Sequence, residues 1–247
     1  MRHILRAAAA LIAISAAAPS LAQDDADDTG FYVSLNAGMA KVNDLNVTYF
    51  APAGTFGGTG SSDTLNFKFD LDSAFAFGGA IGYDFGTVRA DVEVSYSRNK
   101  ASAVTLNSVN GSAVTLTASD RADVCDYLEA ASCGGSGNTF TYDGARARQL
   151  SAIANLWLDL PVGKGITPYA GGGVGVIGYE VDGEGEARFA WQLGAGVAFD
   201  LAKKISLTAD YRYRQGSGVT INDGGGYGTK LDDVKTSTLT AGLRIRF

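Results

Sequence analysis

The feature that most constrains this chain is an alternation of apolar and polar residues with a period of two, which recurs eight times. Such a period indicates strands that have one apolar and one polar face. Each repeat has about the length that a tilted strand needs to cross a bilayer. The eight repeats cover residues 31–39, 75–83, 88–96, 150–159, 168–176, 189–199, 205–214 and 239–247.

The connections between these repeats fall into two kinds. Three are short, at 84–87, 161–165 and 201–204, and four are mostly long and polar, at 41–70, 99–146, 180–187 and 215–235. Short turns at one rim and long loops at the other are typical of outer-membrane barrels. The sequence therefore predicts an all-β fold at 30–247: an eight-stranded antiparallel up-and-down transmembrane β-barrel with both chain ends on the short-turn, periplasmic side.

The rival fold is a soluble eight-stranded barrel such as a lipocalin, whose apolar face turns inward. Alternation alone does not say which face is which. However, the polar face is rich in Gly, Ala and Ser, which suits a crowded interior better than a solvated surface. Aromatic residues near the strand ends fit the girdles of a membrane barrel. These are Phe31, Tyr83, Phe85, Tyr96, Phe199, Tyr211, Tyr213 and Phe247.

The N-terminus has the pattern of a cleaved secretory signal peptide at 1–22. Arg2 and Arg6 precede an apolar run, and Pro19-Ser20-Leu21-Ala22 offers small residues for cleavage before Gln23. Residues 23–29 are then an acidic, disordered periplasmic segment. Because no later stretch reaches 18 apolar residues, the mature chain can enter a membrane only as a closed barrel.

Charge and histidine content exclude several classes of function. Losing Arg2 and Arg6 leaves 18 basic against 26 acidic residues, a formal charge of −8, which argues against a nucleic-acid partner. The only histidine, His3, lies in the leader, so the mature chain cannot use Ser-His or Cys-His catalysis or a His-ligated zinc. We therefore predict no enzyme activity, catalytic residue, cofactor or metal.

Charged residues on the polar strand faces are predicted to form a paired network in the lumen, since buried charges persist only when paired. The alternative is acid–base chemistry by Asp91 and Glu93. Large side chains, including Tyr169 and Gln192, should fill so narrow a barrel, which disfavours a wide pore and leaves a narrow or gated one open. The predicted network consists of Arg89, Asp91, Glu93, Asp210, Arg212, Arg214, Arg244 and Arg246.

Two features stand out in the long connection at 99–146. Cys125 and Cys133 lie close together in an exported chain, which favours a local disulfide over two free thiols or a metal pair. The segment Ser102–Leu106 is repeated at Ser112–Leu116 with Asn110-Gly111 between the copies. We expect a β-hairpin there that extends the third strand beyond the membrane, the alternative being a flexible loop.

Two acidic, Gly-rich segments mark loop tips, at Asp182–Glu186 and Asn222–Gly226. Carboxylates in such loops can bind Ca²⁺ or bridge to lipopolysaccharide through divalent ions. Neither segment has the ligand spacing of an EF-hand, so solvated turns are the preferred interpretation.

Several strands resemble those of a known family. Gly30-Phe31-Tyr32-Val33-Ser34-Leu35-Asn36-Ala37-Gly38 resembles the first strand of small porin-like or opacity-type outer-membrane barrels, and residues 166–175 and 189–197 resemble the fifth and sixth. The resemblance implies the eight-stranded fold of the OmpA transmembrane domain. The ending, with Leu243, Ile245 and Phe247, is similar to the family's assembly signal, which implies recognition by the barrel-assembly machinery. The alternative is simply a last strand with an apolar outer face.

These observations lead to one preferred function and one alternative. The preferred function is a structural surface protein of the bacterial outer membrane whose exposed loops serve adhesion or recognition. Its expected partners are outer-membrane lipid, lipopolysaccharide, the barrel-assembly machinery and an extracellular or host ligand bound by the loops. The alternative is a narrow porin that passes ions or small solutes.

Overall fold

The computed structural model describes residues 29–43, 45–127, 134–141, 146–160, 162, 165–181 and 184–247, with side chains left out at 180–181 and 184–186. The predicted signal peptide and all but the last residue of the predicted acidic segment lie outside these ranges. Within the described part of the chain, no helix is long and apolar enough to cross a membrane.

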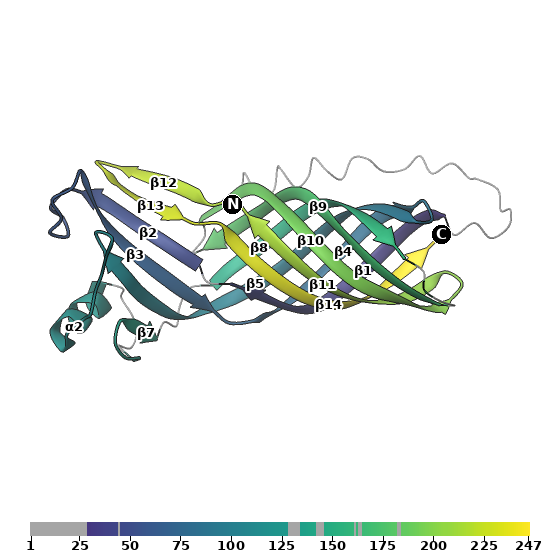
Figure 1. The fold of residues 1–247 in the computed structure, drawn as a ribbon, viewed down its shortest axis with the longest axis horizontal. Helices are drawn as coiled ribbons and strands as arrows, with labels where there is room; N and C mark the ends of the chain where they lie inside the picture. Colours follow the sequence, from purple (N-terminus) through teal and green to yellow (C-terminus); the bar gives the residue numbers. More distant parts are fainter. Residues whose placement is uncertain are drawn as a thin grey trace.

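Eight antiparallel strands form a closed ring (Figure 1). Each strand pairs with the next one along the ring, and the last pairs with the first. Closure leaves no unpaired strand edge within the ring. The predicted eight-stranded barrel is thereby confirmed. The ring strands are β1 (Gly30–Val42), β4 (Ala74–Asp84), β5 (Val88–Val109), β8 (Arg146–Asp159), β9 (Ile166–Val181), β10 (Glu184–Ala202), β11 (Ile205–Gly216) and β14 (Val234–Arg246).

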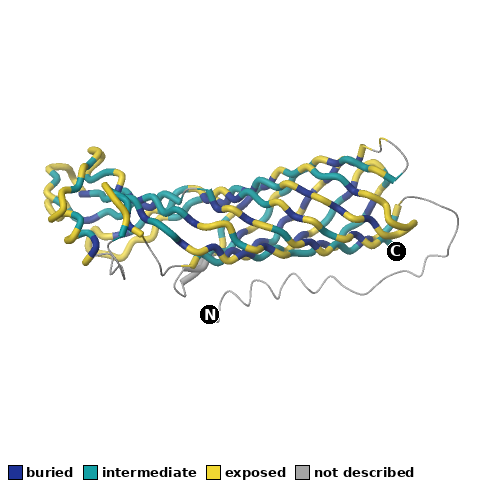
Figure 2. The backbone as a smooth tube through the Cα atoms, turned by 90° about the horizontal axis from the view of Figure 1, so that it is seen from below, coloured by how far each residue is buried: buried dark blue, intermediate teal, exposed yellow. Residues whose placement is uncertain are grey.

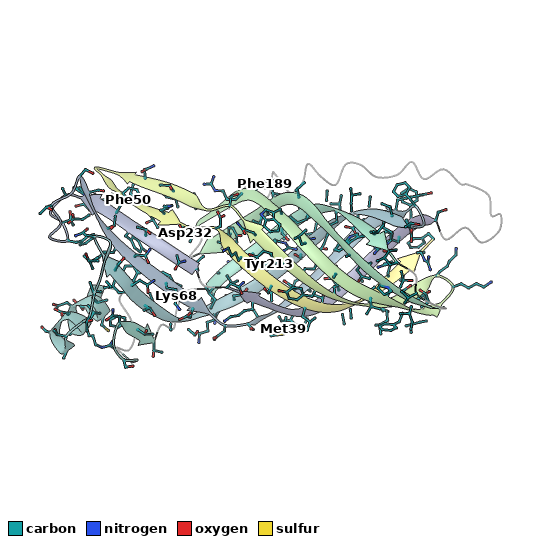
Figure 3. The ribbon with its side chains drawn as sticks, in the orientation of Figure 1. Met39, Phe50, Lys68, Phe189, Tyr213 and Asp232 are labelled. Atoms are coloured by element: carbon teal, nitrogen blue, oxygen red, sulfur yellow. The ribbon has the colours of Figure 1, made fainter. Side chains whose placement is uncertain are left out.

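The outer face of the ring is apolar and the inner face polar. Leu35, Ile81 and Leu239 expose 68%, 67% and 64% of their surface, whereas the buried residues of the same strands include many charged and amide side chains. Figure 3 shows Met39 and Phe189 projecting from the outside of the ring, and Figure 2 shows how burial alternates along its strands. This polarity is opposite to that of a soluble barrel, so the lipocalin-like alternative is wrong.

Aromatic side chains gather near both ends of the ring. At the tight-turn end, the Tyr83 ring lies 5.0 Å from that of Phe31 and 4.7 Å from that of Phe85, centroid to centroid. Toward the other end, the rings of Phe77 and Tyr96 lie 5.5 Å apart. Such belts are found where transmembrane barrels meet the two membrane interfaces.

A second sheet extends the ring at the end opposite the tight turns, and we call it the extension. The order of its longer strands is β12-β13-β2-β3-β5, so β5 belongs to both sheets. The connections predicted as long loops at 41–70 and 215–235 therefore fold largely into hairpins. The strands of these hairpins are β2 (Leu45–Pro52), β3 (Ser62–Leu71), β12 (Val219–Gly224) and β13 (Tyr227–Leu231).

The connection at 180–187 is also shorter than predicted. Strands β9 and β10 stay paired as far as Val181 and Glu184. The predicted acidic tip at Asp182–Glu186 therefore belongs largely to the strands, although residues 182–183 and the side chains at 184–186 lie outside the described part.

The apolar face changes sides between the ring and the extension. The register of β5 against β3 shifts between Asp70 and Leu71 and again between Asn66 and Phe67. Each extra residue in a strand turns the following side chains to the opposite face. The first shift, which lies between Ala101 and Ala103 on β5, therefore leaves Val104 and Leu106 buried against Phe67, although even-numbered residues of β5 within the ring face outward. The extension therefore has an ordinary apolar core, as a sheet in water requires.

The lobe at 110–141 covers this core. Its turn at Asn110-Gly111 has φ angles of 51° and 77°, which suit a two-residue hairpin. The predicted hairpin forms, but it pairs only two residues of β6 (Ser112–Ala113) with β5, because β3 and β7 (Thr139–Thr141) take the two edges of β5 nearer the ring. The lobe continues with the helix α2 (Ala118–Tyr127).

Candidate functional site

The ring lumen gathers most of the predicted charged residues, because a period of two turns every second side chain of each strand inward. Nearest the tight turns, Arg89 donates from Nε and Nη2 to the two carboxylate oxygens of Asp159 at 2.6 and 2.9 Å. Its guanidinium carbon lies 5.6 and 4.9 Å from the ring centroids of Tyr32 and Tyr169. Both ions are buried, so this is a bidentate pair shielded from solvent.

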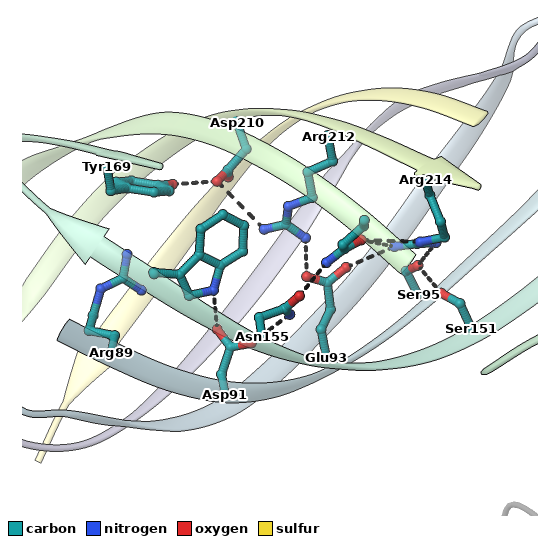
Figure 4. Close-up of polar contacts among 12 residues, drawn as sticks. Arg89, Asp91, Glu93, Ser95, Ser151, Asn155, Tyr169, Asp210, Arg212 and Arg214 are labelled. Atoms are coloured by element: carbon teal, nitrogen blue, oxygen red, sulfur yellow. Dashed lines mark hydrogen bonds and ion pairs between the residues drawn. The ribbon is translucent and has the colours of Figure 1, made fainter. Parts of the chain in front are cut away.

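The next layer contains two carboxylates with different partners (Figure 4). Asp91 accepts hydrogen bonds from Tyr32 Oη at 2.7 Å, Asn155 Nδ2 at 2.7 Å and Trp157 Nε1 at 3.0 Å. Asp210 accepts from Tyr169 Oη and lies 3.5 Å from Arg212 Nη2. Asp91 is thus held by neutral donors, although the sequence predicted it as a member of an ion-pair network.

Glu93 is the centre of the third layer. It is buried on β5 and pairs with Arg212 and, at 3.2 Å, with Arg214, both on β11 across the lumen. Arg214 also donates to Gln192 Oε1 at 2.8 Å and to Ser95 Oγ at 2.9 Å. Because β5 and β11 are not neighbours in the ring, these contacts tie its opposite walls together.

The last two predicted residues lie apart from these carboxylate contacts. Arg244 is buried, with its guanidinium carbon 5.6 and 5.3 Å from the ring centroids of Tyr32 and Tyr169, so it stacks on the two rings that also flank Arg89. Arg246 lies at the tight-turn rim, 3.9 Å from Asp84 and from Asp200. The structure therefore brings seven of the eight predicted residues into the lumen and leaves Arg246 at its mouth.

Bulky side chains leave almost no open space in the lumen. Three inward positions of β9 are Gly171, Gly173 and Gly175, where an added Cβ would lie within 2.3 Å of strand β8. The missing side chain at Gly171 also leaves room for the indole of Trp157 inside the ring. The cavity beside Glu93 and Arg214 has a volume of only about 20 Å³. A cavity of that size holds about one water molecule.

Apolar residues also pack inside the ring. Ile153, Ile177 and Ala190 form one buried cluster from β8, β9 and β10. Beyond it, Val42, Leu71 and Val234 form a second cluster, against which side chains from both the ring and the extension pack. The ring is therefore filled by ion pairs in its middle and by apolar side chains toward the extension.

Sequence reasoning missed two kinds of residue in the lumen. Asp159 ends the strand predicted at 150–159, but it was not predicted as the partner of Arg89. Arg89 lies directly opposite Trp157, so it reaches Asp159 diagonally. Tyr32 and Asn155, the neutral side chains that donate hydrogen bonds to Asp91, were also missed. Their inward register on strands of known alternation was the available signal, but the contacts depend on how the strands are staggered.

The extension has a hollow of about 650 Å³ on its surface, beside the end of β11. Asn46, Gln215 and Lys235 are among its polar lining residues. Asp233 fixes its wall by accepting hydrogen bonds from Gln215 Nε2 at 2.7 Å and from the backbone N–H of Gly218 at 2.9 Å. The hollow is large enough for a small ligand and opens to solvent.

Two carboxylates of the extension have lowered pKa values. Burial raises the pKa of Asp63, but backbone N–H groups of Phe56, Gly58 and Gly54 outweigh it and lower the pKa below its ordinary value of 3.8. Asp120 accepts hydrogen bonds from the backbone N–H and the hydroxyl of Thr117, which lower its pKa. The Asp63 carboxylate thereby fixes the β2–β3 turn, and the Asp120 carboxylate caps the start of α2.

The predicted disulfide is described only on one side. Cys125 is buried against Phe67 and Phe140 in the core of the extension and carries no free thiol. Cys133 lies outside the described residues, so the pairing of the two stays a prediction. Among the described residues, no group of three His, Cys, Asp or Glu side chains gathers into a metal-binding arrangement. The predicted tip at Asn222–Gly226 forms the turn between β12 and β13.

Known proteins share this fold. An uncharacterized protein of Brucella abortus (strain 2308) is 28% identical over 196 residues, which cover 70% of this chain and 61% of the relative. A Brucella suis relative gives the same figures, so the chain spans about three fifths of the length of these curated relatives. Among solved structures, the outer membrane protein OprG of Pseudomonas aeruginosa is 15% identical, with a TM-score of 0.50 over 88% of this chain and 97% of that one.

A second solved structure, Neisserial surface protein A, is 17% identical, with a TM-score of 0.47 over 90% of this chain and 100% of that one. At such identities the likeness concerns the fold alone. The family described as the outer membrane protein beta-barrel domain matches residues 7–247, which includes every strand of the ring and of the extension. With its closed eight-stranded ring, apolar outer face and charged lumen, this chain belongs to the outer membrane protein beta-barrel domain family.

Proposed function

We propose that this outer-membrane barrel is a closed anchor whose function is to hold a structured recognition surface above the membrane. The observation that carries the proposal is the filled lumen. The cavity beside Glu93 and Arg214 has room for about one water, and apolar side chains of the ring and the extension pack together toward the outer end of the ring. We expect this packing to block solutes.

The extension supports the recognition role. It is a folded sheet with its own apolar core, joined to the ring through the continuous strand β5. Its surface includes the hollow beside β11, which is lined by both acidic and basic side chains. A ligand with hydroxyl or charged groups fits such a lining, because these side chains offer donors and acceptors together.

Conductance of the refolded mature barrel in a planar bilayer tests the closed anchor. Folding is checked first by heat-modifiable mobility on a gel, and a general porin in the same bilayer is the positive control. We expect no discrete steps from the folded barrel. Reproducible steps would contradict the proposal.

The second candidate is a narrow porin, and the polar chain through the middle of the ring favours it. If steps appeared, Arg89, Asp91, Glu93 and Arg212 would be the residues that select ions. Neutralising Glu93 should then shift the reversal potential in a salt gradient, whereas neutralising the exposed Lys203 at the rim should not.

We further propose that the protein is not an enzyme and that it reaches the outer membrane through the signal peptide at 1–22. The absence of His from residues 23–247 supports the first point. For assembly, Leu243, Ile245 and Phe247 all face outward at the end of the chain, where the assembly machinery can read them. Deleting Phe247 should reduce the folded fraction in membranes. Unchanged assembly would refute a dominant role for that residue.

A further inference from the structure

Four basic residues form a compact square on the outer face of two neighbouring ring strands. Arg98 on β5 stands directly opposite Arg148 on β8, and Lys100 stands opposite Arg146. The register between these strands is unbroken from Val88 to Lys100. All four positions therefore share the outward face of the exposed apolar residues further down the same strands.

Such pairing of like charges is unfavourable by itself. Residues directly opposite each other have Cβ atoms about 5 Å apart, and like charges there destabilise a sheet. Two such pairs follow each other along the strands, at a spacing of about 7 Å. The square thus concentrates four positive charges on one patch of the outer face.

Among the described acidic residues, Asp72 comes near the square. It follows β3, and its backbone N–H donates to the carbonyl of Lys100. Glu180 stands opposite Arg148 in the register of β8 and β9, but its side chain lies outside the described part. Lys100 and Arg148 have interaction partners within the chain. Positive charge is therefore in excess among the described side chains around the square, whatever contacts each of them makes.

The square lies at the level of the lipid headgroups. One step closer to the membrane on the same face, Tyr96 stands opposite Leu150, and Tyr96 belongs to the aromatic belt with Phe77. Aromatic belts mark the interface of a transmembrane barrel. Figure 1 shows β5 and β8 running together toward the extension, so the basic square is at the outer end of this lipid-facing wall.

We propose that the basic square binds the phosphate groups of lipopolysaccharide in the outer leaflet. Guanidinium groups match phosphate oxygens through paired N–H donors, and Arg supplies three of the four side chains. The assignment rests on the proposed function in placing the extension outside the cell. A lipid is favoured over a soluble anion because the square continues the lipid-facing surface.

The test measures binding of purified lipid A to the folded barrel by native mass spectrometry from detergent micelles. The variant is Arg98→Gln with Arg146→Gln, because these two cations of the square form no hydrogen bond or ion pair within the described part of the chain. The matched control is Lys203→Gln with Lys204→Gln, which removes the same charge from the exposed rim at the other end of the ring. Lipid A stripped of phosphate is the matched ligand.

Each basic side chain near an anionic surface strengthens binding about fivefold, so the double variant should bind lipid A about 30-fold more weakly. The rim control should bind like the wild type, and dephosphorylated lipid A should bind weakly to every protein. Equal affinity of the double variant and the wild type would overturn the proposal. A second result would also overturn the proposal. This is displacement of lipid A from the wild type by a soluble sulfated oligosaccharide at a lower concentration than a phosphate-bearing lipid needs.

Stability in lipid-free micelles gives a second readout. Because the substitutions remove repulsion between like charges, the double variant should unfold at a denaturant concentration equal to or above that of the wild type. Added lipid A should raise the midpoint of the wild type more than that of the variant. A variant that is less stable without lipid would indicate a structural role and contradict the proposal. Silence or conductance in a planar bilayer tests the closed anchor separately.

Discussion

Replacing Glu93 by Gln keeps the shape of the side chain and removes one buried charge from the centre of the lumen. In the wild type this carboxylate lies between Arg212 and Arg214. The side chain of Glu93 is 2% exposed, and those of Arg212 and Arg214 are 11% and 10% exposed. After the change, Arg212 keeps Asp210 as an ionic partner at 3.5 Å. Arg214 keeps only neutral acceptors, Gln192 and Ser95.

The expected cost follows from this geometry. At an effective dielectric constant of about 20, two charges 3.2 Å apart attract by about 5 kcal/mol. Measured losses on breaking one side of a buried ion pair are about 3–5 kcal/mol. We expect Glu93→Gln to lower the free energy of unfolding by about 3 kcal/mol, because the new amide still accepts one hydrogen bond.

Urea unfolding of the barrel in lipid vesicles, followed by heat-modifiable gel mobility, measures this loss. Asp91→Asn is the matched comparison on the same strand. Asp91 is held by neutral donors alone, so the change should cost only about one hydrogen bond, or about 1 kcal/mol. Adding Arg214→Gln to Glu93→Gln should cost less than the sum of the two single changes, because neither charge is then left alone. Equal losses for Glu93→Gln and Asp91→Asn, or strict additivity, would refute the reasoning.

Three further predictions concern other parts of the chain. Gly173→Val should prevent folding, because a Cβ there would lie 2.2 Å from Asn155 Oδ1 and 2.3 Å from the carbonyl oxygen of Ala154. Gly178→Ala on the same strand is the control, since its Cβ would meet only Leu150, at 3.7 Å, and heat-modifiable gel mobility compares the folding of the two variants. The Asp63 carboxylate has a lowered pKa, so it should stabilise the β2–β3 turn fully above pH 3.8 and lose this effect as the pH falls through the lower folded value. Amide exchange at Phe56, corrected for its intrinsic rate, should show this dependence in the wild type but not in Asp63→Asn. A corrected rate that does not change with pH in the wild type would contradict the prediction. Changing Cys125 and Cys133 to Ser should cost about 2–3 kcal/mol of local stability by the loop-closure estimate and expose the lobe to protease, while the heat-modifiable mobility of the ring stays the same; an equally resistant lobe would speak against the disulfide.

The ring was predictable because the bilayer acts on every strand in the same way. Lipid requires apolar residues outside, and the narrow lumen requires polar or small residues inside, so alternation such as that of Val92, Glu93 and Val94 is preserved along each crossing. The tight turns are equally local, since few residues connect β4 to β5. For the ring strands and the tight turns, the pattern in a short stretch of sequence is therefore enough to predict the structure.

The extension and the individual contacts depend on information that no short window holds. Alternation is present at Val47 and Tyr49 and at Phe67 and Phe69, but Gly-rich sequence around it led to a prediction of loops. The bulge in β5 opposite Asp70 and Leu71 reverses the apolar face, so the period of two breaks where the extension begins. Glu93 meets Arg214 only because the ring closes, at a separation of 121 residues.

The continuity of β5 determines how far the extension reaches from the membrane surface. The residues from Ala101 to Val109 continue the strand past the ring without a break, and at about 3.3 Å each they span roughly 30 Å. The headgroup layer of one leaflet is only about 5–8 Å thick. Even when tilted, the outer end of the strand therefore stands clear of the lipid. Because the strand stays continuous through its two bulges, anything that the extension binds is held at a defined distance from the membrane surface.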